Sequence, residues 1–324
     1  MMNSKSQVLC THKIPETGLN ILKNTMDVNI LSEHLPINSQ LQKFLPTTDY
    51  LVPLLSVEIT EDLMDLAPSL KGIANYAVGY NNIDIEAARK RNILVTNTPD
   101  VLTNATADLV WGLILAVTRR IIEGDEICRK DEFPGWLPSY LLGFEITGKT
   151  LGIIGLGRIG TAVAKRALGF DMKVLYHSRT RKHDIDGEFN LIFKENLEDV
   201  LNEADIVSIN VPYTPETHHL MSGHELSLMK SSAYLINTAR GKVINEQELI
   251  HALNNKVIAG AALDVFYNEP SIPAELRKLP NVVLTPHIGS ATTQARNAMA
   301  RMVADNILAI ERNEQPPNLI PEMK

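Results

Sequence analysis

The chain has 324 residues, about the length of two globular domains. Hydrophobic residues make up 44% of it and charged residues 21%, so it can fill two apolar cores and is not an intrinsically disordered protein. Lys and Arg number 31 against 38 Asp and Glu, a net charge of −7, so the sequence lacks the basic excess typical of nucleic-acid-binding proteins.

Cys10 and Cys128 are too few and too far apart for a disulfide framework or a zinc site, and they are typical of a reducing compartment. The N-terminal segment lacks the long apolar stretch of a secretion signal. The longest apolar run, 109–117, is about half as long as a membrane span. We therefore expect a soluble, cytoplasmic protein with no membrane, nucleic-acid or metal partner.

The first hundred residues alternate between strand and helix patterns. Strands are predicted at 7–11, 49–55, 72–78 and 93–97, and helices at 59–67 and 83–91. Such alternation is typical of crossover units in a parallel sheet. A longer helical pattern at 101–122 is apolar on more than one face, which predicts burial at a domain or subunit interface.

A second α/β block begins after a loop rich in Pro, Gly and Trp at 133–143. It starts at 150–160, and its further strands are predicted at 173–178, 205–211, 233–239, 258–265 and 281–286. The last helical pattern, 292–310, is too short to form a domain of its own. We therefore expect the chain to return there to the first domain.

A glycine fingerprint opens the second block. Gly155, Gly157 and Gly160 have the spacing GxGxxG, follow an apolar strand and precede a helical pattern. In that context the first glycine makes a tight turn, the second lets the backbone approach a pyrophosphate, and the third lets the helix pack closely on the strand. This context favours a dinucleotide site over an ordinary glycine-rich turn.

The end of the next strand distinguishes between NAD and NADP. NAD-binding proteins usually have an acidic residue there for the ribose hydroxyl. This chain has Ser178 followed by Arg179, Thr180 and Arg181, which favours binding of the 2′-phosphate of NADP by charge-assisted hydrogen bonds. NAD stays possible, since the same residues could form only a solvated charged loop.

Three charged residues follow three predicted strands of the second block. Arg240, Glu269 and His287 would meet if these strands are neighbours, because ligands bind at the carboxyl ends of parallel strands. An arginine suits a substrate carboxylate, a histidine can pass a proton to a carbonyl oxygen, and a carboxylate can hold the histidine ring. Each residue alone is also an ordinary surface or structural residue, so the pattern leaves the assignment open.

The chain resembles the D-isomer-specific 2-hydroxyacid dehydrogenases over nearly its whole length. The resemblance lies in VGYNNID (78–84), GKTLGIIGLGRIG (148–160), VPYTPETHHL (211–220), NTARGKVINEQEL (237–249), GAALDVFYNEP (260–270) and LTPHIGSAT (284–292). The segment before and through the fingerprint, together with YHSRTRK, is most similar to the glyoxylate/hydroxypyruvate reductase branch, which includes 2-ketogluconate reductases.

The resemblance implies two doubly wound parallel-sheet domains. Residues 101–289 would form the NAD(P)-binding Rossmann domain, and 1–100 with 290–324 a discontinuous, flavodoxin-like substrate-binding domain. It implies NAD(P)H-dependent reduction of a small 2-ketoacid, namely glyoxylate, hydroxypyruvate or 2-ketogluconate, to the D-2-hydroxy acid by a homodimer. The alternatives are a non-catalytic dinucleotide-sensing protein of the same fold and another dehydrogenase of the family, such as phosphoglycerate dehydrogenase.

The resemblance also assigns roles to individual residues. Arg240, Glu269 and His287 would be catalytic, and the backbone amides of Val78 and Gly79 would bind the substrate carboxylate together with Arg240 and His287. The cofactor would contact, besides the fingerprint and the 178–181 loop, Arg158, Ile159, Val211, Pro212, Thr217, Thr238, Ala239 and Asp264. Trp136 would lie in a loop that serves the dimer or the partner's substrate site.

Overall fold

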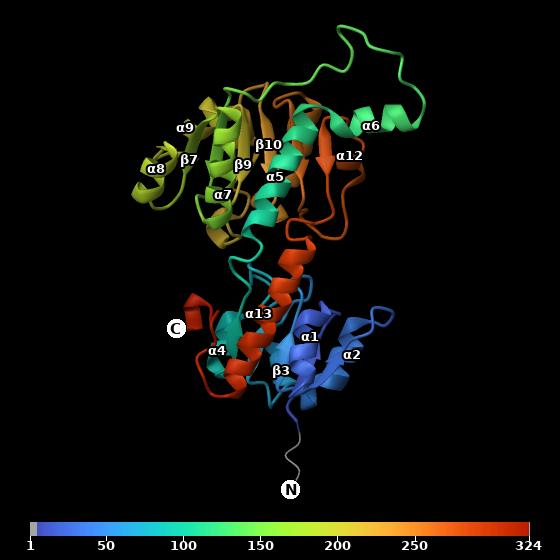
Figure 1. Cartoon of the computed structure of the whole chain (residues 1–324), viewed down its shortest axis with the longest axis vertical. Helices are drawn as coiled ribbons and strands as arrows, with labels where there is room; N and C mark the ends of the chain where they lie inside the picture. The colour runs from blue at the N-terminus through green and yellow to red at the C-terminus, as the bar shows by residue number, and fades with distance from the viewer. Residues whose placement is uncertain (1–4, 324) are drawn as a thin grey trace. The chain divides into compact units, whose positions relative to one another are not determined.

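The computed structural model describes residues 5–323. The chain divides into two compact units (Figure 1): unit 1 comprises Met1–Leu102 and Ser290–Lys324, and unit 2 comprises Thr103–Gly289. Each unit is built around its own parallel sheet with helices packed on it. The predicted fold class, two doubly wound α/β domains, is therefore confirmed.

The sheet of unit 1 has five parallel strands in the order β2-β1-β3-β4-β5, which is the flavodoxin-like order. The strands are β1 (Gln7–Cys10), β2 (Asp27–Ile30), β3 (Tyr50–Val52), β4 (Gly72–Ala74) and β5 (Leu94–Thr96). Every residue of β3 and β4 is buried, as expected for central strands of a parallel sheet that is covered on both faces.

The C-terminal helix belongs to unit 1, where it packs along α1 and against β4 and β5. Gly18 of α1 allows the close approach, because a Cβ there would lie 2.2 Å from the carbonyl oxygen of Ala300. The helices are α1 (Glu16–Lys23), α2 (Ile37–Phe44), α3 (Glu61–Asp65), α4 (Ile85–Lys90) and α13 (Thr293–Glu311), with 3₁₀ turns at Leu45–Thr47 and Pro321–Met323.

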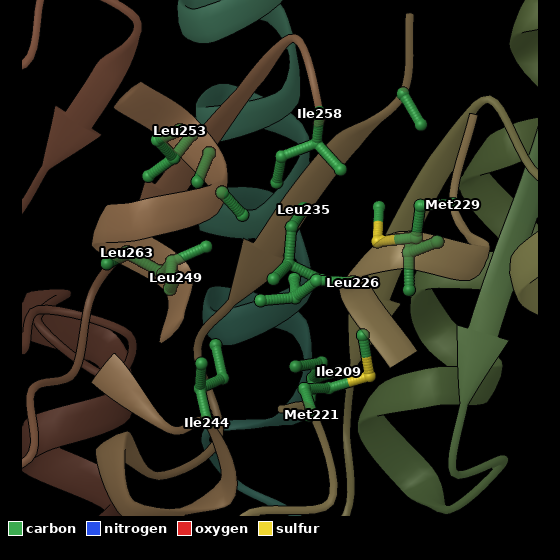
Figure 2. Packing of buried hydrophobic residues seen from close by; sticks show 14 of the residues in the cluster. Ile209, Met221, Leu226, Met229, Leu235, Ile244, Leu249, Leu253, Ile258 and Leu263 are labelled. Atoms are coloured by element: carbon green, nitrogen blue, oxygen red, sulfur yellow. The ribbon is translucent and has the colours of Figure 1, made fainter. Parts of the chain in front are cut away.

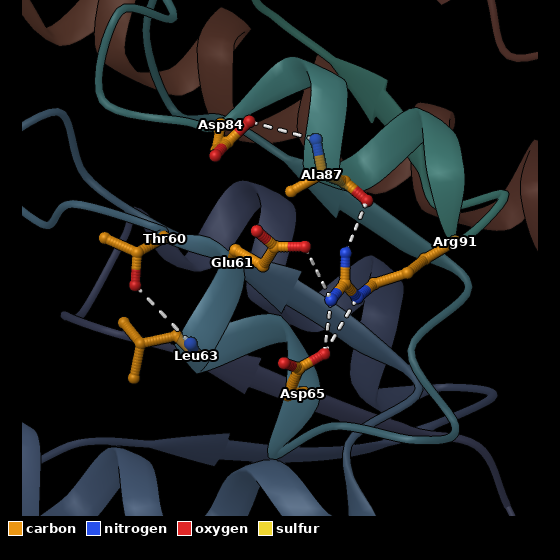
Figure 3. A network of polar contacts seen from close by, with 7 residues as sticks. All are labelled: Thr60, Glu61, Leu63, Asp65, Asp84, Ala87 and Arg91. Carbon is orange, nitrogen blue, oxygen red and sulfur yellow. Dashed lines mark hydrogen bonds and ion pairs between the residues drawn. The ribbon is translucent and has the colours of Figure 1, made fainter.

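Two short helices of unit 1 begin at side-chain caps (Figure 3). Thr60 before α3 and Asp84 before α4 each accept a hydrogen bond from the backbone N–H three residues further on, which stabilises the first turn. Arg91, directly after α4, joins the two helices by ion pairs with Glu61 and Asp65. These contacts fix the connections on either side of β4.

The sheet of unit 2 has seven parallel strands in the order β12-β11-β10-β9-β6-β7-β8. The strands are β6 (Thr150–Ile154), β7 (Lys173–His177), β8 (Ile192–Phe193), β9 (Ile206–Ile209), β10 (Tyr234–Asn237), β11 (Gly260–Leu263) and β12 (Val282–Leu284). The order reverses between β6 and β9, and ligands of open α/β sheets bind at the carboxyl ends of strands at such a reversal.

Helices cover both faces of this sheet, and neighbouring strand residues point into opposite cores. Ile153 of β6 packs with α5 and α7, whereas Ile154 packs with α9, α10 and α11. Figure 2 shows the second of these cores, in which Leu226 lies beside Leu235 of β10 and Leu249 beside Leu263 of β11. The helices are α5 (Thr103–Thr118), α6 (Ile121–Arg129), α7 (Arg158–Ala167), α8 (His183–Phe189), α9 (Leu197–Glu203), α10 (Gly223–Leu228), α11 (Glu246–Asn254) and α12 (Ala274–Arg277), with 3₁₀ turns at Leu168–Phe170, Pro215–Thr217 and Gly241–Val243.

The prediction of one continuous helix over 101–122 is wrong. The chain leaves the helix after Thr118, because Arg120 adopts a left-handed backbone conformation with φ of 53°, and α6 begins at Ile121. The carbonyl oxygen of Thr118 accepts a hydrogen bond from the N–H of Phe144 at 2.8 Å. No helix within residues 5–323 has the length and apolar character needed to cross a membrane.

Candidate active site

Three charged side chains stand after three adjacent strands of unit 2. Arg240 follows β10, Glu269 follows β11, and His287 follows β12. These strands are neighbours in the sheet and run parallel, so their carboxyl ends share one edge. The order of the strands thus brings three residues to one edge of the sheet, although the first and the last of them are 47 positions apart in the sequence (287 − 240 = 47).

A buried asparagine shapes the turn that carries Arg240. Asn237 is fully buried; its side chain accepts a hydrogen bond from the N–H of Ala239 and donates one to the carbonyl oxygen of Arg240, each at 3.0 Å. Gly241 follows, and a Cβ there would lie 1.9 Å from the backbone of Phe266. The turn therefore packs directly on the loop that leads to Glu269.

Glu269 and His287 form a hydrogen-bonded pair. Oε2 of Glu269 lies 2.7 Å from Nδ1 of His287, and Oε1 accepts a hydrogen bond from the N–H of Phe266 at 3.0 Å. Burial alone would raise the pKa of Glu269, but the bond and charge of His287 outweigh it, so this pKa lies below its ordinary value. The pair occupies Nδ1 of the ring, so Nε2 is the nitrogen that can act on a ligand.

Asp264 holds the backbone that follows His287 by hydrogen bonds. His287 has a left-handed backbone conformation with φ of 54°. The fully buried carboxylate of Asp264 accepts hydrogen bonds at 2.8 Å from the N–H groups of Ile288 and Gly289, and one at 2.7 Å from the hydroxyl of Thr285. Burial raises the pKa of Asp264 even though these hydrogen bonds act in the opposite direction.

Arg240 lies within electrostatic range of this pair. Burial lowers the pKa of Arg240, and the negative charge of Glu269 acts against that effect. One Nη atom donates to the carbonyl oxygen of Ala239 at 2.8 Å. An arginine stays protonated under such conditions, so this edge of the sheet combines a fixed positive charge with a histidine–carboxylate pair. That combination can bind an anion and donate a proton beside it.

The glycine fingerprint has the geometry that each glycine requires. Gly155 has φ of 93°, and a Cβ there would lie 2.9 Å from the backbone of Asn210. A Cβ on Gly160 would lie 2.2 Å from the carbonyl oxygen of Gly155, so helix α7 can pack on the turn only with glycine here. A Cβ on Gly157 would meet no protein atom within 4 Å. This open approach at the N-terminus of α7, where Arg158 and Ile159 form the first turn, fits a dinucleotide pyrophosphate.

The other residues predicted to contact the cofactor lie in loops at the same edge of the sheet. Val211, Pro212 and Thr217 follow β9, and Thr238 and Ala239 lie between β10 and Arg240. The hydroxyl of Thr217 donates to the carbonyl oxygen of Pro212 at 2.7 Å, so this side chain shapes its own loop. Within residues 5–323, no group of His, Cys, Asp and Glu is suited to hold a metal ion.

The loop after β7 has internal contacts that the sequence pattern did not indicate. Nε of Arg181 donates to the buried carboxylate of Asp186 at 2.7 Å, and the same carboxylate accepts a bond of 2.5 Å from the hydroxyl of Tyr176. The hydroxyl of Ser178 donates to the carbonyl oxygen of Thr180 at 2.8 Å. Sequence reasoning missed Asp186 and Tyr176.

Arg179 differs from Arg181 in its surroundings. Its side chain is exposed and, among residues 5–323, forms no hydrogen-bonded ion pair with a carboxylate. The predicted carboxylate-binding amides, Val78 and Gly79, lie in unit 1 in the loop that follows β4 and are partly exposed.

Comparisons with known proteins agree with this arrangement. Residues 111–289 match the family described as D-isomer specific 2-hydroxyacid dehydrogenase, NAD binding domain. The chain is 50% identical to a glyoxylate reductase from Pyrococcus horikoshii over 98% of its own length and 96% of that protein.

Solved structures are also similar to this chain over nearly its whole length. A protein from Thermus thermophilus superposes with a TM-score of 0.91 and 43% identity, covering 97% of this chain and 99% of that one. An NADPH-dependent glyoxylate/hydroxypyruvate reductase from Sinorhizobium meliloti, in complex with NADP and malonate, has a TM-score of 0.88 and 32% identity and covers 99% and 98%. The chain belongs to the D-isomer specific 2-hydroxyacid dehydrogenase family.

Proposed function

We propose that this protein reduces a small 2-ketoacid to the D-2-hydroxy acid with a nicotinamide dinucleotide as reductant. The observation that carries the proposal is the Glu269–His287 pair beside Arg240, at the same edge of the sheet as the glycine fingerprint. Relatives that cover nearly the whole chain are named glyoxylate reductases, which supports glyoxylate as a substrate.

The catalytic roles follow from the geometry. Glu269 holds Nδ1 of His287 and stabilises the protonated ring, so Nε2 donates a proton to the carbonyl oxygen of the substrate. Arg240 binds the substrate carboxylate through its planar N–H fork and stabilises the negative charge that develops on the reacting oxygen. The bound dinucleotide supplies the hydride. The amides of Val78 and Gly79 also bind the carboxylate.

Residues along the sheet edge would hold the cofactor. Gly155, Gly157 and Gly160 with the first turn of α7 would bind the pyrophosphate, and Asp264 with Thr238 and Ala239 would lie along the nicotinamide half. We expect NADPH to be preferred to NADH, because Arg179 is exposed after β7 and the residue directly after that strand is Ser178, which carries no charge to repel a 2′-phosphate. The NADPH dependence of the Sinorhizobium meliloti relative supports this preference.

The protein is expected to be a cytoplasmic homodimer. The segment between α6 and β6 extends away from the body of unit 2 (Figure 1) and carries exposed apolar side chains. Phe133, Trp136 and Leu142 are 59%, 83% and 65% exposed. Apolar side chains gathered in one exposed loop are typical of an interface, so we propose a second copy of the chain as their partner.

A substrate panel tests the proposal. NADPH oxidation is measured with glyoxylate, hydroxypyruvate and 2-ketogluconate, and kcat/KM is compared among them and between NADPH and NADH. Turnover of at least one ketoacid supports the proposal, and the ranking identifies the substrate. Binding of NADPH with no turnover of any of the three would instead favour a dinucleotide-sensing protein without catalytic activity.

A further inference from the structure

The loop after β4 presents one side to the interior of unit 1 and the other to solvent. The carbonyl oxygens of three consecutive residues, 77–79, accept hydrogen bonds from unit 1. The first is bonded to the backbone N–H of Thr98 at 2.8 Å. The second is bonded to the side-chain amide of Asn97 at 2.7 Å, and the third to that of Asn75 at 2.8 Å.

These bonds determine where the next three N–H groups point. In a trans peptide the C=O and the following N–H lie on opposite sides, and the peptides of this loop are trans. The N–H groups of residues 78–80 therefore face away from the three interior donors. None of the three has a protein acceptor among residues 5–323. Residues 75–77 are buried and 78–80 are partly exposed, so the three N–H groups are available to a ligand.

The two asparagines are themselves held in place. Asn75 is fully buried, its backbone N–H donates to Thr96 at 2.9 Å, and its side-chain amide exchanges hydrogen bonds of 3.3 Å with that of the buried Asn82. The backbone N–H of Asn97 donates to the carbonyl oxygen of Asn318 at 3.3 Å. The side chain of Asn75 and the backbone of Asn97 are thus each held by a hydrogen bond of their own, whereas residues 78–80 of the loop are partly exposed.

We propose that Asn75 and Asn97 are positioning residues for the substrate carboxylate, which the N–H groups of Val78, Gly79 and Tyr80 bind. Each asparagine fixes one peptide plane, so the amides are oriented before the anion arrives. Consecutive backbone N–H groups that face one side form a concave anion site, and holding them in place in advance lowers the cost of ordering the loop on binding. The proposal rests on the proposed function and adds Tyr80 and both asparagines to it.

The proposal predicts a specific kinetic signature. The carboxylate is not the reacting group, and its bonds to these amides are equally strong in the ground state and in the transition state. Loss of such a bond raises KM and leaves kcat unchanged. Asn97→Ala should raise KM for glyoxylate about three- to tenfold, the effect of one lost hydrogen bond, and Asn75→Ala should act in the same direction.

The experiment measures two quantities for each variant. One is kcat and KM for glyoxylate with saturating NADPH. The other is the dissociation constant of oxalate with saturating NADP⁺, since oxalate carries the same carboxylate and cannot be reduced at that position. Asn97 is partly exposed, so Asn97→Ala decides the question even if the buried Asn75→Ala does not fold.

Gln40 provides a matched control. It is a buried side-chain amide of unit 1 that donates to the carbonyl oxygens of Ser32 and Leu35, with no bond to the 77–80 loop. Gln40→Met should lower the melting temperature as an asparagine variant does, yet leave KM and the oxalate affinity unchanged.

Three outcomes are distinct. Weaker glyoxylate and oxalate binding with unchanged kcat in Asn97→Ala, but not in Gln40→Met, supports the proposal. An active wild type whose folded Asn97→Ala variant binds both ligands normally overturns the proposal and leaves the proposed function intact. A wild type that neither reduces glyoxylate nor binds oxalate overturns both.

Discussion

Replacing Glu269 by Gln keeps the size of the side chain, removes one negative charge, and turns one of the two accepting oxygens into an NH2 donor. Gln has the same size, and its carbonyl oxygen can still accept the hydrogen bond from the N–H of Phe266. With that oxygen bonded to Phe266, the NH2 group faces His287 and cannot accept the bond that the carboxylate now makes at 2.7 Å. Such bonds contribute about 1.5–3 kcal/mol, and because the two side chains are 29% and 34% exposed we take the lower end. A loss of that size is about tenfold in an equilibrium that depends on the bond.

The sign follows from the direction of the reaction. Reduction needs a proton on His287, and the carboxylate of Glu269 favours that form, so kcat/KM of Glu269→Gln should fall at a lower pH than kcat/KM of the wild type. The pKa of Glu269 is lowered in the wild type, so the carboxylate stays charged throughout the pH range of this limb. The ratio of wild-type to variant activity should thus be small at acidic pH and rise to about tenfold above the limb.

The assay is reduction of glyoxylate by NADPH from about pH 5 to pH 9, where histidine normally titrates. Glu275→Gln is the control, since Glu275 is an exposed glutamate on α12 of the same unit. A wild-type to variant ratio that stays the same at every pH would show that the charge of Glu269 does not support the proton donor, and the assignment of His287 would lose its main argument.

Further variants test the other roles. His287→Ala should lower kcat by about 10²–10⁴-fold while NADPH binding, followed by fluorescence titration, stays normal; near-normal kcat would exclude His287 as the proton donor. Arg240→Lys should raise KM for the ketoacid, because an ammonium cannot reproduce the planar fork, and an unchanged KM would remove Arg240 from carboxylate binding. Arg179→Ala should raise KM for NADPH about tenfold and leave KM for NADH unchanged. Arg181→Ala should mainly lower the melting temperature. Equal kcat/KM for NADPH and NADH in the wild type would refute the preference for NADPH.

The position of each of the three charged residues after a strand could be predicted, whereas the order of the strands that brings them together is seen in the sheet. Each residue follows a strongly apolar run, and a parallel sheet brings the carboxyl ends of its strands to one edge. The contacts that hold them could not be predicted. Asn237 and Asp264 bond to backbone groups of neighbouring loops, and such pairings depend on loop geometry that spacing does not determine.

The elements that escaped prediction carry weak local signals. Strands β2 and β8 are short and partly exposed, so they lack the apolar run of a central strand. Helices α1 and α2 have eight residues each and begin after Pro15 and Pro36, without a side-chain cap. These elements lie at the edges or on the faces of the sheets, and none of them is one of the strands after which Arg240, Glu269 and His287 stand.

The loop after β7 shows why the number of arginines in a sequence overestimates how many can bind a phosphate. The sequence places Arg179 and Arg181 two positions apart, and both count equally toward binding of a 2′-phosphate. In the fold, Asp186 lies in α8 and is buried. Its carboxylate accepts one hydrogen bond from the hydroxyl of Tyr176 and one from Nε of Arg181. A guanidinium held by a carboxylate has part of its charge neutralised, so it attracts a second anion less strongly. Discrimination between NADPH and NADH should therefore depend on Arg179, which no pattern in the sequence distinguishes from its neighbour.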